Sequence, residues 1–289
     1  MKELIWLNGK TIPLSEAMVS VEDRGFQFAD GVYEVVRIYN GRPFTLTEHL
    51  DRLERSCGGI ALDLPMGKTP LAAEIIELID QTGVKDGMIY LQLTRGHAPR
   101  NHVYSNPKPT LLFYARALPR MSRPADVKGL KLISVPDERW SRCWIKSIAL
   151  LPNVLAKNMA VAAGADEAAF VHEGIVTECA TSNLFIVSRN MLLTHPVGPK
   201  VLPGITRALL LNLAGELGIP AIERPVSEAK VLAADEVFIT STTRELAWVA
   251  QWNSRAIANS KCGAITTRLH AAYQSRVSEH AQGQMAKGK

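Results

Sequence analysis

Apolar side chains recur along the chain at two spacings, one typical of strands and the other typical of helices. Segments 3–7 and 32–39 are rich in β-forming residues, and each is followed by an Asn-Gly pair that favours a tight hairpin turn. From residue 46 to residue 60 the apolar positions recur every three or four residues, which predicts an amphipathic helix. Thr45 and Glu48 have the spacing of a capping box at its start.

The remaining apolar segments extend this pattern to the C-terminal part of the chain. A second helix is predicted from Pro70 to a stop at Gly83, and the Pro-containing stretch 118–127 is predicted to be a linker. Further strands are predicted near 88–94, 110–117, 130–135, 168–172, 183–188 and 236–241, and further helices at 153–163, 205–217 and 264–279. We therefore expect an α/β (α+β) protein with a small N-terminal domain, 1–117, and a larger domain, 128–289.

The composition is that of a globular protein of about two domains. Its 289 residues are 47% apolar, which is enough for a sizeable core. The net charge of +5 comes from 33 basic and 28 acidic residues, and the basic ones are scattered, so we expect no nucleic-acid partner. No stretch approaches the roughly 18 uninterrupted apolar residues of a membrane helix, and the N-terminus does not predict a signal peptide.

The four cysteines are far apart and have neither metal-binding spacing nor histidines clustered beside them. They are Cys57, Cys143, Cys179 and Cys262. We therefore expect no metal site, and reduced thiols in a cytoplasmic protein.

Lys146 is the first candidate for chemistry, because it lies between large apolar residues in Trp-Ile-Lys-Ser-Ile. Burial of a lysine favours the neutral amine, which is the form that attacks an aldehyde. Taken alone, however, the segment is better explained by a lysine at a strand edge whose amino group reaches water than by a buried catalytic amine.

Two further segments have the groups that bind an anion. A glycine turn at Gly204 leads into a helical pattern with Thr206 in its first turn, and a helix N-terminus of this kind binds phosphate. Four hydroxyl residues, 240–243, follow a predicted strand. When each segment is considered alone, ordinary helix capping explains the first better, and a polar turn explains the second better.

Two charged residues complete the set of candidates. Glu178 ends a short β-rich segment, and Arg52 lies on the helix predicted at 46–60; each also fits an ordinary surface position. Together, a lysine, an anion site and an acid are what pyridoxal 5′-phosphate (PLP) requires. The lysine forms a Schiff base, the anion site binds the phosphate, and the acid keeps the pyridine nitrogen protonated. The lysine amine then carries the proton at the substrate α-carbon.

The segment 22–36, E-D-R-G-F-Q-F-A-D-G-V-Y-E-V-V, resembles the N-terminal signature of the fold-type IV (class IV) PLP-dependent aminotransferases. The resemblance covers nearly the whole chain and continues in order through 48–53, 139–147, 176–178, 204–207 and 240–243. It implies the two-domain fold-type IV architecture and a homodimer with shared active sites. Within the family the chain is most similar to the bacterial D-amino-acid aminotransferases.

The resemblance also implies a role for each matching residue. Lys146 carries the Schiff base, and Glu178 pairs with the pyridine nitrogen. Arg139 lies near the ring hydroxyl, and Leu202 packs on the ring. The residues that bind the phosphate are Arg52, Ile205, Thr206 and Thr242.

The substrate residues implied by the resemblance are Tyr33, Arg100 and His102. In the D-specific branch an Arg-x-His pair and a tyrosine bind the substrate α-carboxylate, and the pair comes from the neighbouring subunit. An arginine fork suits a carboxylate, and a histidine adds a donor. Without the resemblance, Arg100 and His102 fit ordinary polar loop residues.

One segment departs from the family pattern. After Glu178 the family commonly has small residues and serines before an asparagine, whereas this chain has Cys179-Ala180-Thr181-Ser182-Asn183. Thr181 can still donate a hydroxyl, but Ala180 cannot.

The resemblance implies transamination of D-amino acids, with 2-oxoglutarate or pyruvate as the acceptor. The alternatives on the same fold are an L-branched-chain aminotransferase and an aminodeoxychorismate lyase, and the Arg100-x-His102 pair argues against both. A non-catalytic PLP-binding protein is disfavoured by the intact set of Lys146, Glu178 and Arg139.

Overall fold

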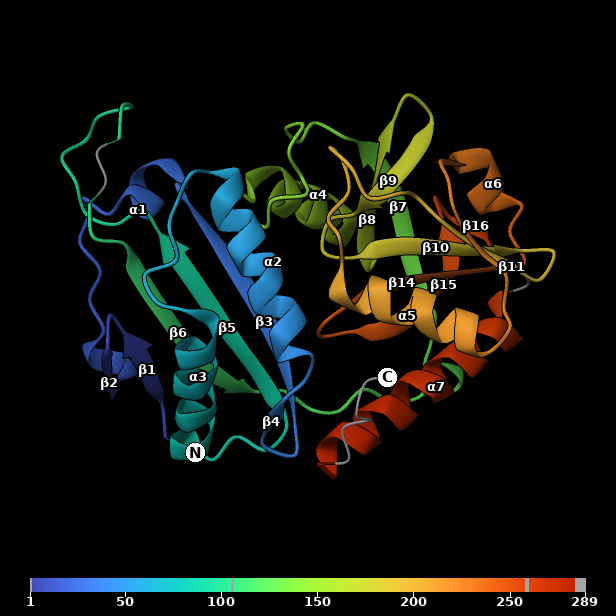
Figure 1. Ribbon diagram of the computed structural model, residues 1–289. Helices are drawn as coiled ribbons and strands as arrows, with labels where there is room; N and C mark the ends of the chain where they lie inside the picture. Colours follow the sequence, from blue (N-terminus) through green and yellow to red (C-terminus); the bar gives the residue numbers. More distant parts are fainter. Residues whose placement is uncertain (1, 105–106, 258–259, 284–289) are drawn as a thin grey trace. The chain divides into compact units, whose positions relative to one another are not determined.

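The computed structural model describes residues 2–104, 107–257 and 260–283 (Figure 1). The chain forms two compact units. The first contains the residues up to Arg120, the segment Ile145–Ala149 and the residues from Val277 on, and the second contains Met121–Trp144 and Leu150–Arg276. The linker predicted at 118–127 and the two domain ranges stay predictions. The compact units differ from those ranges mainly because the segment that contains Lys146 groups with the first unit.

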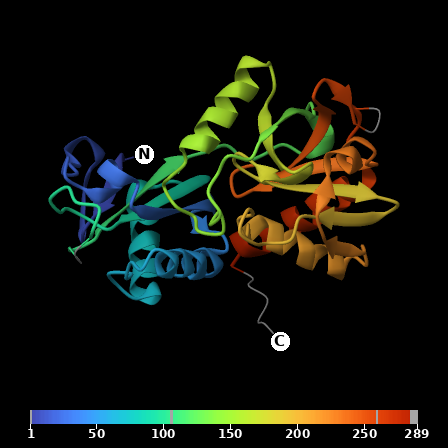
Figure 2. The same cartoon turned by 90° about the horizontal axis from the view of Figure 1, so that it is seen from above.

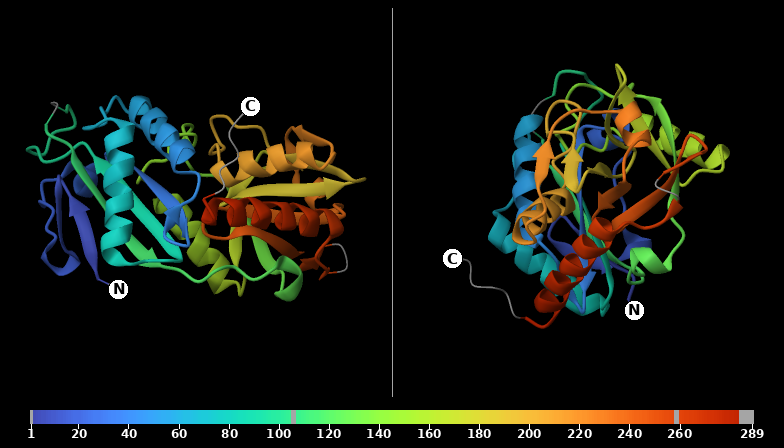
Figure 3. Two further views of the ribbon diagram at one scale, coloured as in Figure 1. Left: turned by 60° about the horizontal axis from the view of Figure 1, so that its bottom comes forward. Right: turned by 90° about the vertical axis from the view of Figure 1, so that its right-hand side faces the viewer.

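The first unit is built on an antiparallel sheet with the strand order β2-β1-β6-β5-β3-β4. Its strands are β1 (Leu4–Leu7), β2 (Lys10–Pro13), β3 (Gly31–Tyr39), β4 (Arg42–Pro43), β5 (Gly87–Thr94) and β6 (Thr110–Ala117). Its helices are the short α1 (Arg24–Phe28), then α2 (Leu46–Gly59) and α3 (Lys68–Thr82), with a 3-10 turn at Leu14–Glu16. Helices α2 and α3 lie over one face of the sheet (Figure 3, left).

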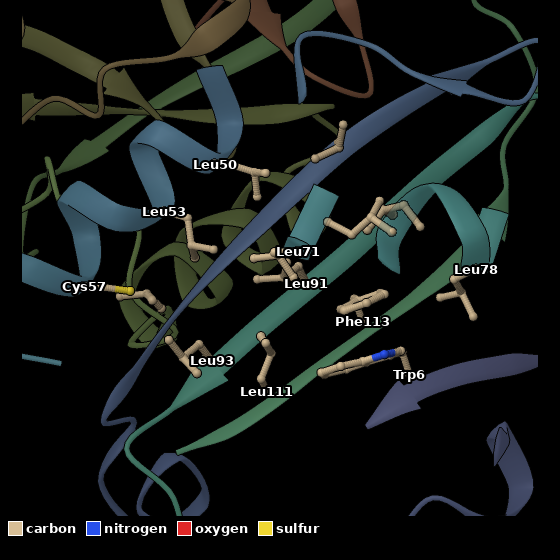
Figure 4. Close-up of a cluster of buried hydrophobic side chains, with 14 of the residues drawn as sticks. Trp6, Leu50, Leu53, Cys57, Leu71, Leu78, Leu91, Leu93, Leu111 and Phe113 are labelled. Carbon is tan, nitrogen blue, oxygen red and sulfur yellow. The ribbon is translucent and has the colours of Figure 1, made fainter. Parts of the chain in front are cut away.

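The core of the first unit fills the space between the sheet and helices α2 and α3 (Figure 4). Leu50, Leu53 and Cys57 come from one face of α2, at the helical spacing that predicted this element. The rings of Trp6 and Phe113 stack with their centroids 4.8 Å apart on neighbouring strands. The amphipathic face of α2 therefore fixes this helix against β3.

The predicted hairpin turns are confirmed by the backbone. Asn8 and Gly9 both have positive φ angles, 50° and 93°, and Asn40 and Gly41 have φ angles of 49° and 76°. Two successive residues with positive φ match the right-handed twist of the flanking strands.

The capping box predicted for α2 is wrong. Thr45 is itself in the left-handed region, with φ of 51°, and its hydroxyl donates to the Phe44 carbonyl instead of accepting from a helix N–H. Its side chain therefore cannot cap the helix. The second helix begins at Lys68, two residues before Pro70, and ends at Gly83 as predicted.

The second unit is built on a mixed sheet with the strand order β12-β11-β10-β14-β15-β7-β8-β9-β13. Its strands are β7 (Leu130–Pro136), β8 (Glu167–His172), β9 (Ile175–Cys179), β10 (Asn183–Ser188), β11 (Met191–Thr194), β12 (Ala221–Glu223), β13 (Val226–Ser227), β14 (Glu236–Ser241) and β15 (Glu245–Trp252), with β16 (Arg255–Ala256) paired to β15. Parallel pairing joins β15 to β7, β7 to β8 and β11 to β12.

The helices of the second unit are α4 (Leu151–Ala162), α5 (Ile205–Glu216), α6 (Glu228–Leu232) and α7 (Ala264–Ala281), with a 3-10 turn at Pro124–Asp126. Figure 2 shows α4 and α5 on opposite sides of the strands. The last residues of α7 belong to the first unit. No helix in the described part of the chain is long and apolar enough to cross a membrane.

Candidate active site

Lys146 is held in the first unit by main-chain bonds to the edge of β3. The Tyr33 N–H donates to the Lys146 carbonyl at 2.9 Å, and the Ile148 N–H donates to the Gly31 carbonyl at 3.1 Å. The Ser56 hydroxyl on α2 accepts from the Lys146 N–H at 3.1 Å. A Cβ at Gly31 would lie 2.6 Å from the Leu93 carbonyl oxygen, so only glycine fits where the backbones of β3 and β5 come this close. The backbone of Lys146 is thus fixed by neighbours on both sides.

The side chain of Lys146 lies over Tyr33. The amino group is 4.3 Å from the ring centroid, and Lys146 is half-buried between the buried residues Ile145 and Ser147. The segment is not one of the strands, but its side chains alternate between buried and half-buried positions as they do in an extended chain. The structure therefore brings two predicted site residues, Lys146 and Tyr33, into direct contact.

Arg52 belongs to a buried charged group that the sequence did not reveal. Its Nε and Nη2 donate to the two oxygens of Glu34, at 2.7 and 2.8 Å, and His49 Nδ1 lies 2.7 Å from Glu34 Oε2. Burial on its own raises the pKa of Glu34, but the charges of Arg52 and His49 outweigh it and hold the pKa well below its usual range. Arg52 is thus fixed in place from α2. Its predicted contact with phosphate stays a prediction.

Glu178 lies at the centre of the predicted site residues in the second unit. Its carboxylate accepts from Arg139 Nη1 at 2.5 Å, and from the Asn183 side-chain amide and the Leu202 main-chain N–H at 3.0 Å each. Three donors from three different segments therefore orient the carboxylate.

Arg139 is itself held by Asp137, another residue that the sequence did not reveal. Its Nε and Nη2 donate to the two Asp137 oxygens at 2.9 Å, and its guanidinium lies 4.2 Å from the Phe170 ring centroid. Burial on its own raises the pKa of Asp137, but the hydrogen bonds and charge of Arg139 outweigh it and lower this pKa. Asp137, Arg139 and Glu178 thus form a continuous buried network. The Asp-x-Arg spacing in the sequence was the only available signal.

The predicted phosphate-binding turn is the N-terminus of α5. Gly204 is the N-cap residue and provides no side-chain cap, so the first N–H groups of Ile205 and Thr206 begin the helix. A Cβ at Gly204 would lie 2.0 Å from Asn183 Oδ1, which explains why glycine is required. The Leu202 carbonyl accepts from the Asn183 amide at 3.0 Å. Asn183 therefore joins this turn to Glu178.

The hydroxyl residues 240–243 begin within β14 and continue into the turn that follows it. Thr240 is 1% exposed, and its Oγ1 has no hydrogen-bond partner among the described residues. Thr242 is half-buried in the turn. An unpaired buried hydroxyl is costly, so a ligand or water that bonds Thr240 would stabilise this end of the strand.

The segment that departs from the family pattern uses its hydroxyl for another contact. Thr181 donates to the buried Glu167 at 2.5 Å, and the Ala180 carbonyl accepts from the Asn153 amide. Burial raises the pKa of the Cys179 thiol well above its usual range. The contacts of Thr181 and Ala180 fix the loop within the second unit, and burial favours the protonated form of the Cys179 thiol.

Arg100 and His102 lie on an exposed loop of the first unit. The Arg100 guanidinium is 4.4 Å from the Phe28 ring centroid, and the His102 ring is 5.3 Å from the same ring. The structure therefore brings these two predicted substrate residues together around one aromatic side chain.

Known proteins resemble the chain over nearly its whole length. Residues 31–252 match the family described as amino-transferase class IV. A D-alanine aminotransferase of Bacillus licheniformis is 41% identical over 274 residues, which cover 94% of this chain and 96% of that enzyme. One of Listeria innocua is 43% identical over 275 residues, with 93% and 94% covered. Among solved structures, a T.th. branched-chain amino acid aminotransferase with pyridoxamine 5′-phosphate has a TM-score of 0.90 at 27% identity, covering 99% of this chain and 96% of that one.

The fold is therefore that of the fold-type IV aminotransferases, and the chain belongs to the class IV aminotransferase family. These enzymes depend on PLP, and the groups present here fit that cofactor. The α5 N-terminus and the unpartnered Thr240 hydroxyl suit a phosphate. The oriented Glu178 suits a protonated ring nitrogen. In the described residues, no cluster of His, Cys, Asp and Glu is arranged to hold a metal ion.

Proposed function

We propose that this chain transfers the amino group of a D-amino acid to a 2-oxo acid, pyruvate or 2-oxoglutarate, with PLP attached to Lys146. The observation that carries the substrate class is the identity of more than 40%, over nearly the whole chain, with enzymes named D-alanine aminotransferase. The candidate residues of both units have side-chain types and contacts that suit this chemistry.

When bound, PLP supplies a carbonyl carbon for the amino group and a ring that stabilises negative charge at the substrate α-carbon. Lys146 is the proton carrier, and its amino group over the Tyr33 ring holds the proton that moves to and from this carbon. Glu178, oriented by Arg139 and by the Leu202 N–H, keeps the ring nitrogen protonated. The phosphate would be held by Ile205, Thr206, Thr242 and Arg52.

The substrate α-carboxylate is bound by Arg100 and His102, with the Tyr33 hydroxyl as a third donor. A charge-assisted fork from arginine fixes the carboxylate in one orientation. Once the carboxylate and the amino group are both fixed, only one enantiomer presents its α-hydrogen to Lys146. The D preference therefore depends on where the loop places the carboxylate.

Two observations argue against the two alternatives on this fold: the sequence identities and the Arg100-x-His102 pair of the loop. The L-branched-chain aminotransferases share the architecture, but the identity of the solved example is 27%, well below that of the D-alanine enzymes. The Arg100-x-His102 pair belongs to the D-specific pattern and is not expected in a branched-chain enzyme or an aminodeoxychorismate lyase.

We further infer a homodimer in which Arg100 and His102 act in the partner's active site. Large apolar side chains are exposed in both units, as is typical of surfaces that associate. In the first unit they are Met18, Val21, Phe26 and Val103, and on α4 they are Leu151, Val154, Leu155 and Met159. The α4 residues recur at helical spacing and so form one apolar face.

We also infer a cytoplasmic enzyme, on the basis of its cysteines. Cys57, Cys143 and Cys179 are buried free thiols, and Cys262 is also a free thiol. Burial raises the pKa of Cys57 to about 12 and that of Cys143 to about 11, so both stay protonated and unreactive. This pattern suits a reducing compartment.

The proposal is tested by Arg100→Ala, assayed with D-alanine and 2-oxoglutarate. Loss of a charge-assisted contact to the carboxylate is expected to raise KM about tenfold or more, with PLP content unchanged. A variant with unchanged KM for D-alanine would overturn the assignment of Arg100. Arg116→Ala, at an exposed ion pair with Glu3 in the same unit, is the control.

A further inference from the structure

The described residues of the loop that contains Arg100 and His102 form no helix or strand. It follows β5, and its residues from Pro99 to Tyr104 are exposed in the described chain. A carboxylate-binding pair on such a loop needs support, because flexible side chains lose much of their binding energy to ordering. The support must come from buried residues beneath the loop.

Arg24 is the buried residue that supplies a direct bond to this loop. It is 4% exposed and begins the short helix α1. Its Nη1 donates to the carbonyl of Asn101 at 2.5 Å. Asn101 is the residue between Arg100 and His102, so the anchored peptide is the one flanked by the two substrate-binding side chains.

Arg24 is also fixed at its own end. Its Nε donates to Asp30 Oδ2 at 2.9 Å, and its main-chain N–H donates to the Gly96 carbonyl at 2.9 Å. Arg95 donates to the same Asp30 oxygen at 2.8 Å and caps the carbonyls of Ile60 and Ala61. Arg24 is therefore fixed at both ends: its main chain is bonded to the base of the loop at Gly96, and its guanidinium is bonded to Asp30 and to the Asn101 carbonyl.

Aromatic rings complete the support. The Phe28 ring lies 4.7 Å from the Arg24 guanidinium carbon and 4.4 Å from that of Arg100. The Tyr104 ring lies 3.7 Å from the guanidinium carbon of Arg95. Planar guanidinium groups stack on such rings, whereas a lysine ammonium cannot combine stacking with two directed hydrogen bonds.

We propose that Arg24 is a positioning residue for substrate binding: through its bond to the Asn101 carbonyl and its contact with Phe28, it sets the geometry of Arg100 and His102. This inference rests on the proposed function, because it assumes that Arg100 and His102 bind the substrate carboxylate. Arg24 acts through these residues and does not touch the substrate.

The test is Arg24→Lys, which keeps the positive charge but loses the fork. If Arg24 positions the loop, KM for D-alanine rises about tenfold, while kcat changes less than about threefold and PLP content is unchanged. If Arg24 contributed only its charge, Arg24→Lys would keep the wild-type KM. A KM within about twofold of wild type would therefore overturn the inference.

A double-mutant cycle separates this inference from the proposed function. In an Arg100→Ala background, Arg24→Lys should raise KM by a smaller factor than in wild type, since the part of its effect that passes through Arg100 is lost and only the part through His102 remains. Fully additive effects would contradict the positioning role. If Arg100→Ala alone left KM unchanged, the proposed carboxylate site would fail instead.

Amide exchange gives a readout that does not depend on activity. Peptides covering residues 97–104 should exchange faster in Arg24→Lys than in wild type, and no faster in the control Arg116→Gln. Unchanged exchange in the Arg24 variant would count against the inference. If Arg24→Lys does not fold, Phe28→Leu replaces it, because it removes the ring shared by Arg24 and Arg100; it should also raise KM, and an unchanged KM would contradict the account.

Discussion

Glu34 and Arg52 form a two-pronged ion pair that is entirely buried, with Nε–Oε1 and Nη2–Oε2 distances of 2.7 and 2.8 Å. Glu34 comes from β3 and Arg52 from α2, so the pair fixes the helix to the strand whose edge also holds Lys146. The pair thus connects the stability of the first unit to the place of the candidate catalytic lysine.

Glu34→Gln should destabilise the first unit strongly. The amide leaves the buried Arg52 without a full charge partner, and breaking a buried pair in this way typically costs about 3–5 kcal/mol. Urea unfolding followed by circular dichroism measures the loss. Asp51→Asn on α2, which breaks an exposed pair with Lys68 of α3, is the matched control and should leave stability unchanged. Equal effects of the two substitutions would refute the structural role of Glu34.

The stability of the protein should fall as the pH is lowered from 8 to 5, and His49 should account for part of the loss. Burial lowers the pKa of His49 below its usual 6.5, and the positive charges of Arg52 and Lys146 lower it further. The carboxylate of Glu34 raises this pKa, but it does not offset the effect of burial. Because the folded pKa is lowered, His49 contributes stability above about pH 6.5, and the contribution is lost as the pH falls towards the folded pKa.

The slope of this loss is at most about 1.4 kcal/mol per pH unit for each such histidine. His270 and His280 also have lowered pKa values, so they add to the dependence. Unfolding free energies of wild type and His49→Gln, measured from pH 5 to pH 8, should give a shallower slope for the variant. Identical slopes would show that His49 is not buried in its neutral form.

Several elements could be predicted from the sequence because local chemistry determines them. The Asn-Gly turns need positive φ, and the apolar face of α2 repeats at helical spacing, so both were visible without tertiary information. Strands such as β11 and β15 were missed, since strands with most residues buried on both faces show no clear alternation.

The site was predictable in its residue types and less so in its supporting contacts. Glu34 sits among β-forming residues and looks like an ordinary polar position of a half-buried strand, although its partners Arg52 and His49 are 18 and 15 residues away. The bond from Arg24 to the Asn101 carbonyl joins residues 77 positions apart. No local pattern indicates such contacts, because they depend on how the strands are arranged.

Glu178→Gln should bind PLP and turn over slowly. A neutral amide cannot keep the ring nitrogen protonated, and the substitution also removes one of the two carboxylates paired with Arg139. A fall in kcat of about a hundredfold or more, with cofactor absorbance retained, is the expected result of steady-state assays and spectra. A variant with nearly normal kcat would show that ring protonation has another source.

Hybrid dimers should test whether the substrate residues act in the partner's site. Inactive Lys146→Ala chains are mixed with impaired Arg100→Ala chains and allowed to exchange subunits. If Arg100 acts across the dimer, one site of each hybrid has a wild-type lysine and a wild-type arginine, so activity returns. If Arg100 acts within its own chain, the mixture is no more active than Arg100→Ala alone.

The most direct test of the central claim is an amino-donor assay with enantiomerically pure D- and L-alanine and 2-oxoglutarate as acceptor. The account predicts that pyruvate and D-glutamate form from D-alanine, at a rate far above that with L-alanine, because the loop carrying Arg100 and His102 fixes the carboxylate for one enantiomer only. Turnover of L-alanine with none of D-alanine would contradict it.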